Sequence, residues 1–480
     1  MARYVLAMAI VVSAFGVLMN KIWEFLGREP VLFFDLALML PAVLLGSVCW
    51  WKGRSYASRW PVVLCVALIW MSLYFPGNSE RLRGFLIAAL VTIPLPLAAL
   101  IVEKRAWSFC AKVYVWANAA MMTAALWFES RVEHSFLHAL GRFGFLVRAD
   151  GSSHTGNPNQ VGGQLAFAAV VAFILYLKSC EEKKETADSK MPDVYLALMV
   201  FLSVGCMLTV SRGAFAAWLP AMGLLLVFGT GNLPMTRLRD LLALSCMGVI
   251  LVVGLMVAKQ TTPWGRLQER FGADSSRSLS GRADIWGSAV KAWQSHPDFI
   301  WRGTGIGMAD DVLGQYSPTT DANDEGVLRK NCHNGAVEWM LSLGLVGIVV
   351  GMCLAGSMAY QTLRLDGRDR NVGRSAMIIC VVIFAMTAVS YRHKCWPATA
   401  ALVLASLTEP AVRRRKDGRS RASQVASSST LTGYHFSGAQ DVGRPVVMES
   451  HVATRPGNFK VESNPYPGEA DGQADQQANH

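Results

Sequence analysis

Apolar blocks of roughly 16–20 residues recur along the chain, separated by short polar or basic segments. Blocks of this length can cross the hydrocarbon core of a membrane as α-helices. They lack the alternation of apolar and polar residues that transmembrane β-strands require. The pattern predicts an all-α, polytopic membrane protein with about 12 transmembrane helices, centred near Ile10, Leu40, Ala67, Val91, Ala120, Val170, Phe201, Met222, Gly248, Val349, Val382 and Leu402.

The composition supports this class of protein. Hydrophobic residues make up 52% of the 480 residues and charged residues 16%, whereas soluble domains carry about a quarter charged residues. The net charge of +11 comes mostly from Lys and Arg in short loops between the apolar blocks. Such a distribution is typical of topology signals rather than of a nucleic-acid-binding surface. We therefore expect contacts with membrane lipids and none with nucleic acid.

The basic loops also predict the orientation. If the N-terminus is cytoplasmic, the Lys- and Arg-rich loops all fall on the inner side, and both termini are cytoplasmic. Two long loops then lie outside, at about residues 129–160 and 259–334. Residues 1–410 form the transmembrane domain. Residues 411–480 are rich in Ser, Gly, Pro, Gln and Asp and lack periodicity, which predicts a disordered cytoplasmic tail.

The stretch NCHNGAVEWMLSLGLVG, residues 331–347, places a His-Asn pair at the start of an apolar block. Asn334 is a candidate N-cap of that helix, and Glu338 lies one turn later on the same face. His333 has two interpretations. It is either an interfacial histidine beside a helix cap or a general base, since neutral imidazole accepts a proton near pH 7.

Two arginines lie where a cation is unfavourable. Arg212 stands between two apolar blocks with almost no polar linker, so it either snorkels to water or binds an anion such as phosphate. Arg282 lies in a predicted amphipathic helix that would begin at Ser280 or Gly281, and the helix dipole disfavours a cation in the first turn. The apolar face of that helix would point to the bilayer surface or the spans, and comprises Ile285, Trp286, Ala289, Val290 and Trp293.

Two glycine- or asparagine-rich stretches predict turns. RGTGIG, residues 302–307, has glycines at alternate positions and predicts a tight turn with close backbone approach. GNPN, residues 156–159, predicts a turn into the sixth span with Asn159 as its N-cap. Arg148 adds a guanidinium near the outer surface.

The sequence provides little support for a metal or a disulfide. His134, His138 and His154 match no metal-binding spacing, and no carboxylate cluster accompanies them. We therefore predict no metal and no cofactor. Cys332 and Cys395 both lie in segments predicted to reach the outer side, which leaves a disulfide between them open.

Taken in order, these motifs resemble the O-antigen ligase and polymerase superfamily of bacterial cell-envelope glycosyltransferases. The resemblance rests on Arg148 with GNPN, SRGA at 211–214, GRADIW at 281–286 followed by GTGIG, and the His-Asn pair. Nine residues separate Asn334 from Gly344-x-x-Gly347, as in the ligase pattern. The resemblance covers about residues 1–410.

The resemblance implies a membrane-embedded, multi-span glycosyltransferase of the bacterial inner membrane whose site faces the periplasm. It would take a glycan from undecaprenyl pyrophosphate and transfer it to lipid A–core, by an inverting and metal-independent reaction. By position, His333 would be the catalytic base, and Arg212, Arg282, Arg148 and Asn334 would bind substrate.

Alternatives within and outside this class remain open. Polymerases of O-antigen or exopolysaccharide, and oligosaccharyltransferases that glycosylate proteins, share much of the layout, although the His-Asn-x9-GxxG spacing favours a ligase. A transporter of lipid-linked glycans is a remote alternative, because transporters place polar residues near the midplane in paired halves. Here the polar residues gather at one face.

Overall fold

The computed structural model describes residues 1–25, 32–52, 60–74, 81–132, 158–183, 191–209, 211–230, 275–316, 332–363, 368–387 and 394–407. Within these residues 91% are helical and there is no strand, which confirms the all-α class. The centre predicted near Gly248, Arg148 and the tail after about residue 410 lie outside the described residues.

The helices follow one another closely along the chain. The first group comprises α1 (Ala2–Phe25), α2 (Leu32–Trp51), α3 (Trp60–Met71), the short η1 (Ser72–Tyr74), α4 (Arg81–Thr92), α5 (Pro94–Glu103) and α6 (Trp107–Val132). The second group comprises α8 (Pro158–Lys183), α9 (Met191–Leu208), α10 (Arg212–Leu224) and the π-helical turn η2 (Leu225–Gly229). The third comprises α13 (Ser275–Gln294), α14 (Pro297–Arg302), α15 (Ala309–Tyr316), α16 (Gly335–Leu363) and α17 (Arg368–Thr387), followed by the apolar helix Trp396–Leu407.

Six of the described helices are long and apolar enough to cross a membrane: Arg81–Glu103, Trp107–Trp127, Asn159–Glu181, Met191–Leu208, Arg212–Gly229 and Gly335–Ser357. Shorter apolar helices occupy Ala2–Gly16, Ala37–Trp51, Val62–Tyr74, Val372–Thr387 and Trp396–Leu407. Each predicted span centre within the described residues lies in one of these helices. The total of twelve spans stays a prediction.

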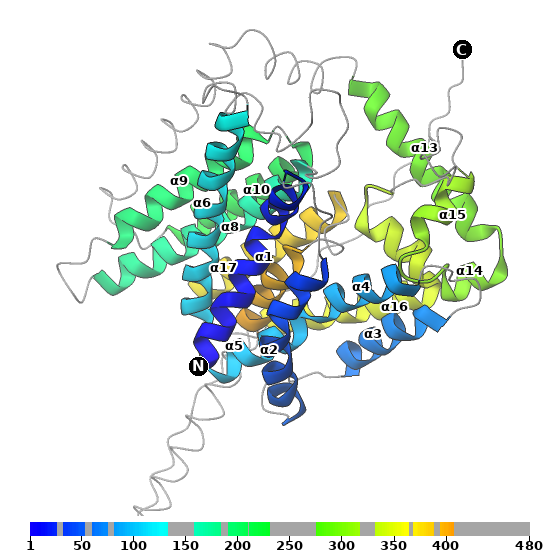
Figure 1. Cartoon of the computed structure of the whole chain (residues 1–480), viewed down its shortest axis with the longest axis horizontal. Coiled ribbons are helices and arrows are strands. Elements are labelled where there is room, and N and C mark those ends of the chain that lie inside the picture. Colours follow the sequence, from blue (N-terminus) through cyan, green and yellow to red (C-terminus); the bar gives the residue numbers. More distant parts are fainter. Residues whose placement is uncertain are drawn as a thin grey trace, which may run out of the picture. The chain divides into compact units, whose positions relative to one another are not determined.

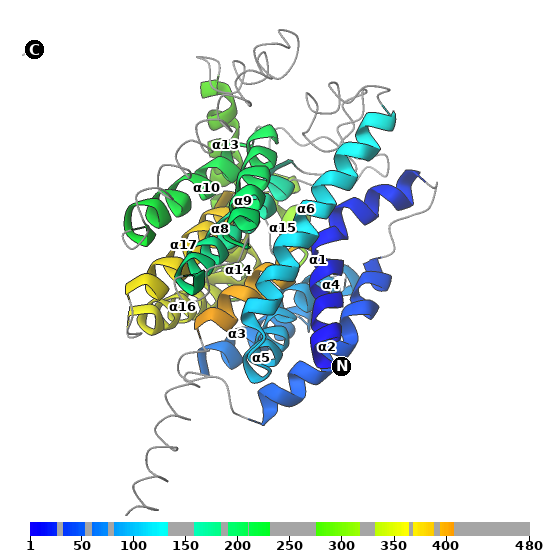
Figure 2. The same cartoon turned by 90° about the vertical axis from the view of Figure 1, so that its left-hand side faces the viewer.

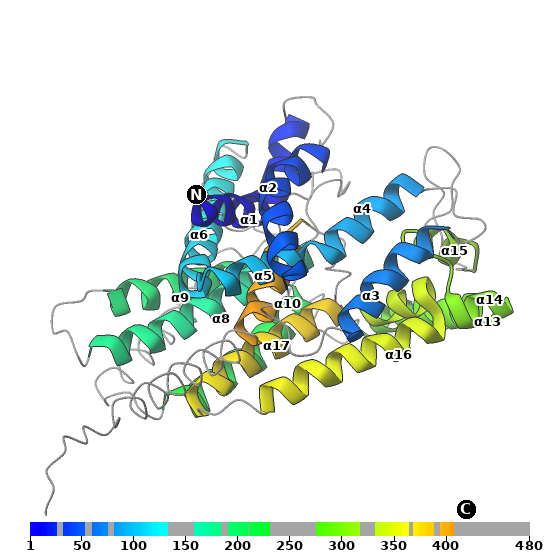
Figure 3. The same ribbon diagram turned by 90° about the horizontal axis from the view of Figure 1, so that it is seen from below.

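The centre of the core is α8. Every residue from Val161 to Phe173 is buried, as expected for a helix that is apolar all round. It packs against α6, α9, α10 and α17, and Figure 3 shows α8 and α9 side by side. On the other side of α6 lie α1 and α2, and α1 and α6 pack together in the view of Figure 2.

Two polar side chains inside this core, Gln164 and Asn118, are paired with each other. The Gln164 amide Nε2 donates to the Asn118 side-chain oxygen at 2.7 Å and to the Ala14 carbonyl at 2.8 Å. These bonds link α8 to α6 and α1 in an environment where unpaired polar groups are costly. The network therefore fixes the register of three helices.

The described part of the segment before α16, residues 275–316, folds into α13, α14 and α15. α13, α14 and α15 pack against α16 and lie together beside its start in Figure 1. Ile285 and Ala289 of α13 are buried with Leu313, Cys332 and Leu341. Trp286 and Trp293 are partly buried in the same cluster, whereas Val290 is 39% exposed. The predicted apolar face is therefore confirmed except at Val290.

Candidate functional site

The GNPN and SRGA motifs meet where α8 and α10 begin. The Ser211 hydroxyl donates to the Asn159 side-chain oxygen at 2.6 Å and accepts from the backbone N–H of Ala214 at 3.1 Å. Ser211 is thus the N-cap of α10. Asn159, predicted as an N-cap, instead lies inside the first turn of α8, because Pro158 takes the first helical position that its fixed φ favours.

Arg212 is the first residue of α10. The sequence predicted that Arg282 would lie in the first turn of a helix, but it is Arg212 that does. A cation at a helix N-terminus is unfavourable because it meets the positive end of the helix dipole. The same end of a helix attracts anions. A guanidinium at this place is favourable if an anion binds between it and the positive N-terminus of α10.

Arg282 lies near Arg212, although SRGA and GRADIW are far apart in the sequence. The pKa of Arg282 is lowered, first because the side chain is partly buried and second because the positive charge of Arg212 is close. Two nearby guanidinium groups repel each other, and an anion with several oxygens would relieve this repulsion. The pair therefore has the chemistry of an anion clamp.

The predicted start of α13 was wrong. The helix begins at Ser275 rather than at Ser280 or Gly281, so Arg282 lies in its interior. The residues between, SSRSLS, contain no proline and no glycine that would stop a helix from extending backwards.

Cys332, the residue before His333, is held in place by α13. The Trp286 indole Nε1 donates to the backbone carbonyl of Cys332 at 3.1 Å, and the Cys332 side chain is fully buried. Trp286 lies one turn beyond Arg282 on α13, so the two share a face of that helix. The GRADIW motif thus contacts the His-Asn motif directly at Cys332.

The backbone at His333 adopts φ +50°, a left-handed conformation. Such a conformation costs about 1–3 kcal/mol in a residue other than glycine, and is concentrated at functional sites. Asn334 then caps α16, because its Oδ1 accepts from the N–H groups of Ala336 at 2.9 Å and Val337 at 3.3 Å. The predicted cap is confirmed. Glu338 is buried beneath this first turn.

The helix α16 is broken at Gly344, where φ is +64° and ψ is −160°. The break removes backbone carbonyls from the helical ladder. The GTGIG stretch supplies replacement donors, since the N–H groups of Thr304 and Gly305 donate to the carbonyls of Leu341 at 2.8 Å and Ser342 at 3.0 Å. The predicted tight turn is confirmed, and its close backbone approach is to α16.

Glycine is required on both sides of this contact. A Cβ on Gly303 would lie 2.3 Å from the Ser342 carbonyl carbon, and a Cβ on Gly344 would lie 2.6 Å from the Gly303 nitrogen. Gly303, Gly305 and Gly307 all have positive φ. The second glycine of the GxxG pattern, Gly347, accepts a hydrogen bond at 3.0 Å from the Trp339 indole.

Further contacts attach the GTGIG turn to the transmembrane helices. Arg83 of α4 forms an ion pair with Asp310 at 2.7 Å, and Asp311 lies 3.7 Å from the same guanidinium. The Ile306 N–H donates to the Ser72 hydroxyl at 3.2 Å. Neither Arg83 nor Ser72 was predicted from the sequence, because its one signal there is an arginine at the start of an apolar block, which is also typical of a topology signal.

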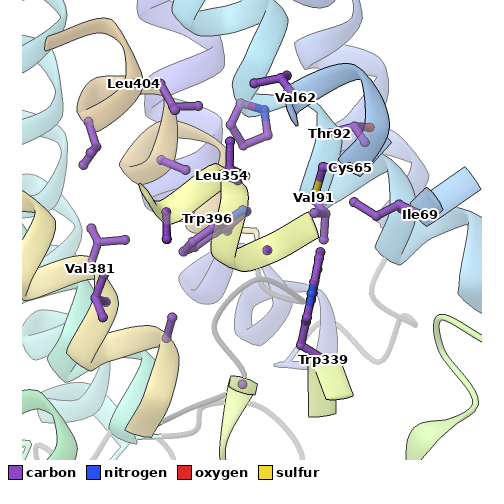
Figure 4. A pocket seen from close by; sticks show the side chains of 18 of the residues that line it. Val62, Cys65, Ile69, Val91, Thr92, Trp339, Leu354, Val381, Trp396 and Leu404 are labelled. Atoms are coloured by element: carbon purple, nitrogen blue, oxygen red, sulfur yellow. The ribbon is translucent and has the colours of Figure 1, made fainter. Parts of the chain in front are cut away.

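An apolar cavity of about 530 Å³ opens beside the first turn of α16. Gly335, Ala336 and Trp339 form the part of its wall next to the His-Asn motif. Residues of α3, α4, α5, α17, the helix Trp396–Leu407 and the part of α16 after Gly347 form the rest (Figure 4). The Thr92 hydroxyl on its wall donates a hydrogen bond to the Ala88 carbonyl at 2.8 Å. The surface left for a ligand is apolar, and so suits hydrocarbon.

The remaining predictions have mixed outcomes. Cys332 and Cys395 are both buried and lie in separate apolar clusters, with no disulfide between them. The described residues contain no group of three or more His, Cys, Asp or Glu that could hold a metal ion. Arg148, His134, His138 and His154 lie outside the described residues.

The comparisons with known proteins agree with the motifs. Residues 197–352 match the family model described as O-antigen ligase. The match confirms the resemblance to the O-antigen ligase and polymerase superfamily. The matched segment includes Arg212, Arg282, His333 and the break at Gly344. Family members are glycosyltransferase-like enzymes. No curated protein matches the chain.

Proposed function

We propose that this protein is an O-antigen ligase that transfers a glycan from undecaprenyl pyrophosphate to lipid A–core at the periplasmic face of the bacterial inner membrane. The observation that carries the proposal is the convergence of three motifs far apart in the sequence. Arg212 lies close enough to Arg282 to lower its pKa, and α13 carries Arg282 and holds Cys332, the neighbour of His333.

The proposed reaction needs a base on one side and a charged clamp on the other. His333 accepts the proton of an acceptor hydroxyl, and the hydroxyl oxygen forms a bond to the anomeric carbon of the donor glycan. The bond from that carbon to the pyrophosphate oxygen breaks, and undecaprenyl pyrophosphate leaves with the electron pair. Attack opposite the leaving group inverts the configuration. Arg212 and Arg282 stabilise the charge that develops on the leaving group.

Asn334 would take part through its nitrogen. Its Oδ1 is used by the helix cap, which leaves the Nδ2 hydrogens for the acceptor or the donor sugar. Arg148 would be a further donor-binding residue. Because the phosphate charge is balanced by arginines, the transfer as proposed needs no metal.

The apolar cavity supports a lipid-linked substrate. Its wall begins at Gly335, two residues after His333, and is almost entirely hydrocarbon. A polyprenyl chain that entered here would lie among the transmembrane helices while its pyrophosphate remained near the polar motifs. This arrangement also favours an enzyme over a transporter, whose polar features lie near the midplane.

The test is transfer by the purified protein from undecaprenyl-pyrophosphate glycan, together with donor-binding affinity. His333→Ala should lower turnover about 10²–10⁴-fold, the usual scale of general base catalysis, with donor affinity little changed. Arg212→Ala and Arg282→Ala should weaken donor binding as well, and the Lys variants should restore it only in part, because a point charge cannot form a two-pronged contact. Near-normal transfer by His333→Ala would exclude the base assignment.

A genetic experiment separates ligase from polymerase. Deletion of the gene should leave lipid A–core without long glycan if the protein is the ligase. A single repeat unit attached to the core would instead identify a polymerase. A normal lipopolysaccharide with a missing protein-linked glycan would indicate protein glycosylation.

A further inference from the structure

We propose that Trp286 is a positioning residue that aims His333 at the acceptor, by holding the Cys332 peptide through its indole N–H. The inference rests on the proposed role of His333 as the base. It concerns a side chain that carries no charge and takes no proton, and that donates a hydrogen bond to the backbone carbonyl just before the His-Asn pair.

The three residues of the Cys-His-Asn stretch are not held equally. The Cys332 side chain is buried under α13 and its carbonyl receives the Trp286 N–H. The Asn334 side chain is fixed on the first turn of α16. His333 lies between these two fixed points with a left-handed backbone.

This backbone conformation determines where the imidazole points. Cα–Cβ leaves the chain in a direction set by φ and ψ, so rotation of the 332–333 peptide redirects the side chain. A left-handed conformation persists only where the surroundings hold it. The Trp286 hydrogen bond acts on the peptide carbonyl immediately before His333, and its loss would allow His333 to relax toward φ below zero.

The same helix carries a residue of the proposed donor site. Arg282 lies one turn before Trp286 on α13. A shift of α13 would therefore move the arginine and the tether together. By this arrangement α13 keeps the distance between the donor clamp and the acceptor base constant, which is what transfer between two bound substrates requires.

The chain contains a matched control on the same helix. Trp293 lies two turns beyond Trp286, in the same apolar cluster. Its indole N–H is buried and has no hydrogen-bond partner among the described residues. Trp→Phe removes an N–H at both places, but only at Trp286 does that N–H hold the peptide before His333.

The experiment measures transfer and donor affinity for Trp286→Phe and Trp293→Phe at equal amounts of folded protein. Trp286→Phe should lower kcat about 10–100-fold, the scale of a base misplaced by about 1 Å, and change donor affinity less than about twofold. Trp293→Phe should behave like the unaltered protein. Equal kcat for the two variants would overturn the inference.

Two further measurements separate positioning from stability. Benzothienylalanine at position 286 keeps the shape of the indole and replaces only the N–H with sulfur, so it should reproduce the loss without affecting folding. In a His333→Ala background, Trp286→Phe should cause no additional loss, because the two residues act as one unit. Losses that multiply would overturn the inference.

The outcomes distinguish the two proposals. If His333→Ala abolishes transfer while benzothienylalanine at position 286 is harmless, only the role of Trp286 fails. If His333→Ala retains transfer, the base assignment fails and the positioning role fails with it.

Discussion

The helices α8 and α16 begin alike and are built differently. Each starts beside an asparagine motif and carries a pair of glycines in its first half, Gly162 and Gly163 in α8 and Gly344 and Gly347 in α16. In α8, 83% of the most apolar 18 residues are buried, whereas in α16 only 28% are. α8 is therefore held by neighbouring helices on all sides, and α16 must be held in another way.

The glycines of α8 allow close packing of side chains against a continuous helix. A Cβ on Gly162 would lie 2.5 Å from the Thr209 hydroxyl oxygen and 2.7 Å from the Ala214 Cβ, and one on Gly163 would lie 2.1 Å from the Phe384 ring. Small residues at helix contacts are the usual means of close approach in membranes. This packing supports the start of α10, where Arg212 lies.

In α16 the glycine at position 344 breaks the helix instead. Gly344 adopts a conformation that L-residues avoid, and the GTGIG turn pairs with the released carbonyls. Irregular backbone at membrane depth is tolerated only where protein satisfies it. The arginine side of the site thus depends on helix packing, and the histidine side depends on a backbone contact with a distant turn.

Of the substitutions that test this comparison, Gly344→Ala should lower the free energy of unfolding most. The substitution combines a penalty of about 1–3 kcal/mol for a side chain in this backbone conformation, which is essentially restricted to glycine, with a clash against the backbone of Gly303 and Trp301, which adds about 1–3 kcal/mol. Gly356→Ala on the same helix is the control, because a Cβ at that position would have no atom within 4 Å of it. It should leave the midpoint of thermal unfolding in detergent unchanged or higher. Equal midpoints for the two variants would contradict the break at Gly344.

Gly163→Ala tests the helix packing at α8. It should lower the free energy of unfolding by less, about 1–3 kcal/mol, because the Phe384 ring can move whereas backbone cannot. A second change, Phe384→Leu, should recover part of the loss by making room for the methyl group. Gly223→Ala in α10 has open space around it and serves as control. Thermal unfolding measures all of these variants. If Phe384→Leu adds to the loss instead, the clash is misidentified.

These two helices also show what the sequence can predict. The length of the recurring apolar blocks predicted the all-α class and placed span centres on described helices. The Asn334 cap and the GTGIG turn followed from local residue chemistry, which acts over a few positions. The sequence placed Arg212 between two apolar blocks with almost no polar linker, but it did not predict that Arg212 begins a helix.

What the sequence did not predict depends on contacts between distant segments. GxxG within an apolar block is typical of helix packing, so the break at Gly344 could not be inferred without the partner turn far earlier in the chain. Asn159 was interpreted as an N-cap because the local sequence does not show that its side chain bonds to Ser211, which lies in another motif. The Trp286 bond was missed because a tryptophan on an apolar face is usually only core.

Asn334→Ala should have an intermediate effect, about 0.5–2 kcal/mol, through loss of the cap of α16. Asn334→Asp should restore the unfolding midpoint, since a carboxylate accepts the same N–H groups and suits the helix dipole. An assay of glycan transfer tests whether Asn334 has a second role. If Asn334→Asp recovers stability and not activity, the Asn334 nitrogen contacts substrate; recovery of both would limit Asn334 to the cap.

Trp339→Phe should have the smallest effect. The indole N–H of Trp339 bridges the break by donating to the Gly347 carbonyl, and loss of one such bond costs about 0.5–1.5 kcal/mol. Trp116→Phe, on the exposed side of α6, is the control and should leave the unfolding midpoint unchanged.

Trp339 also lines the apolar cavity, so its ring and its N–H can be tested apart. Phenylalanine keeps an aromatic wall and should leave donor affinity unchanged while lowering the unfolding midpoint slightly. Trp339→Ala removes the wall and should weaken binding of an undecaprenyl-linked donor more than binding of an analogue with a short lipid chain. Equal weakening for both donors would show that Trp339 acts only on the broken helix, and that the chain of the donor lies elsewhere.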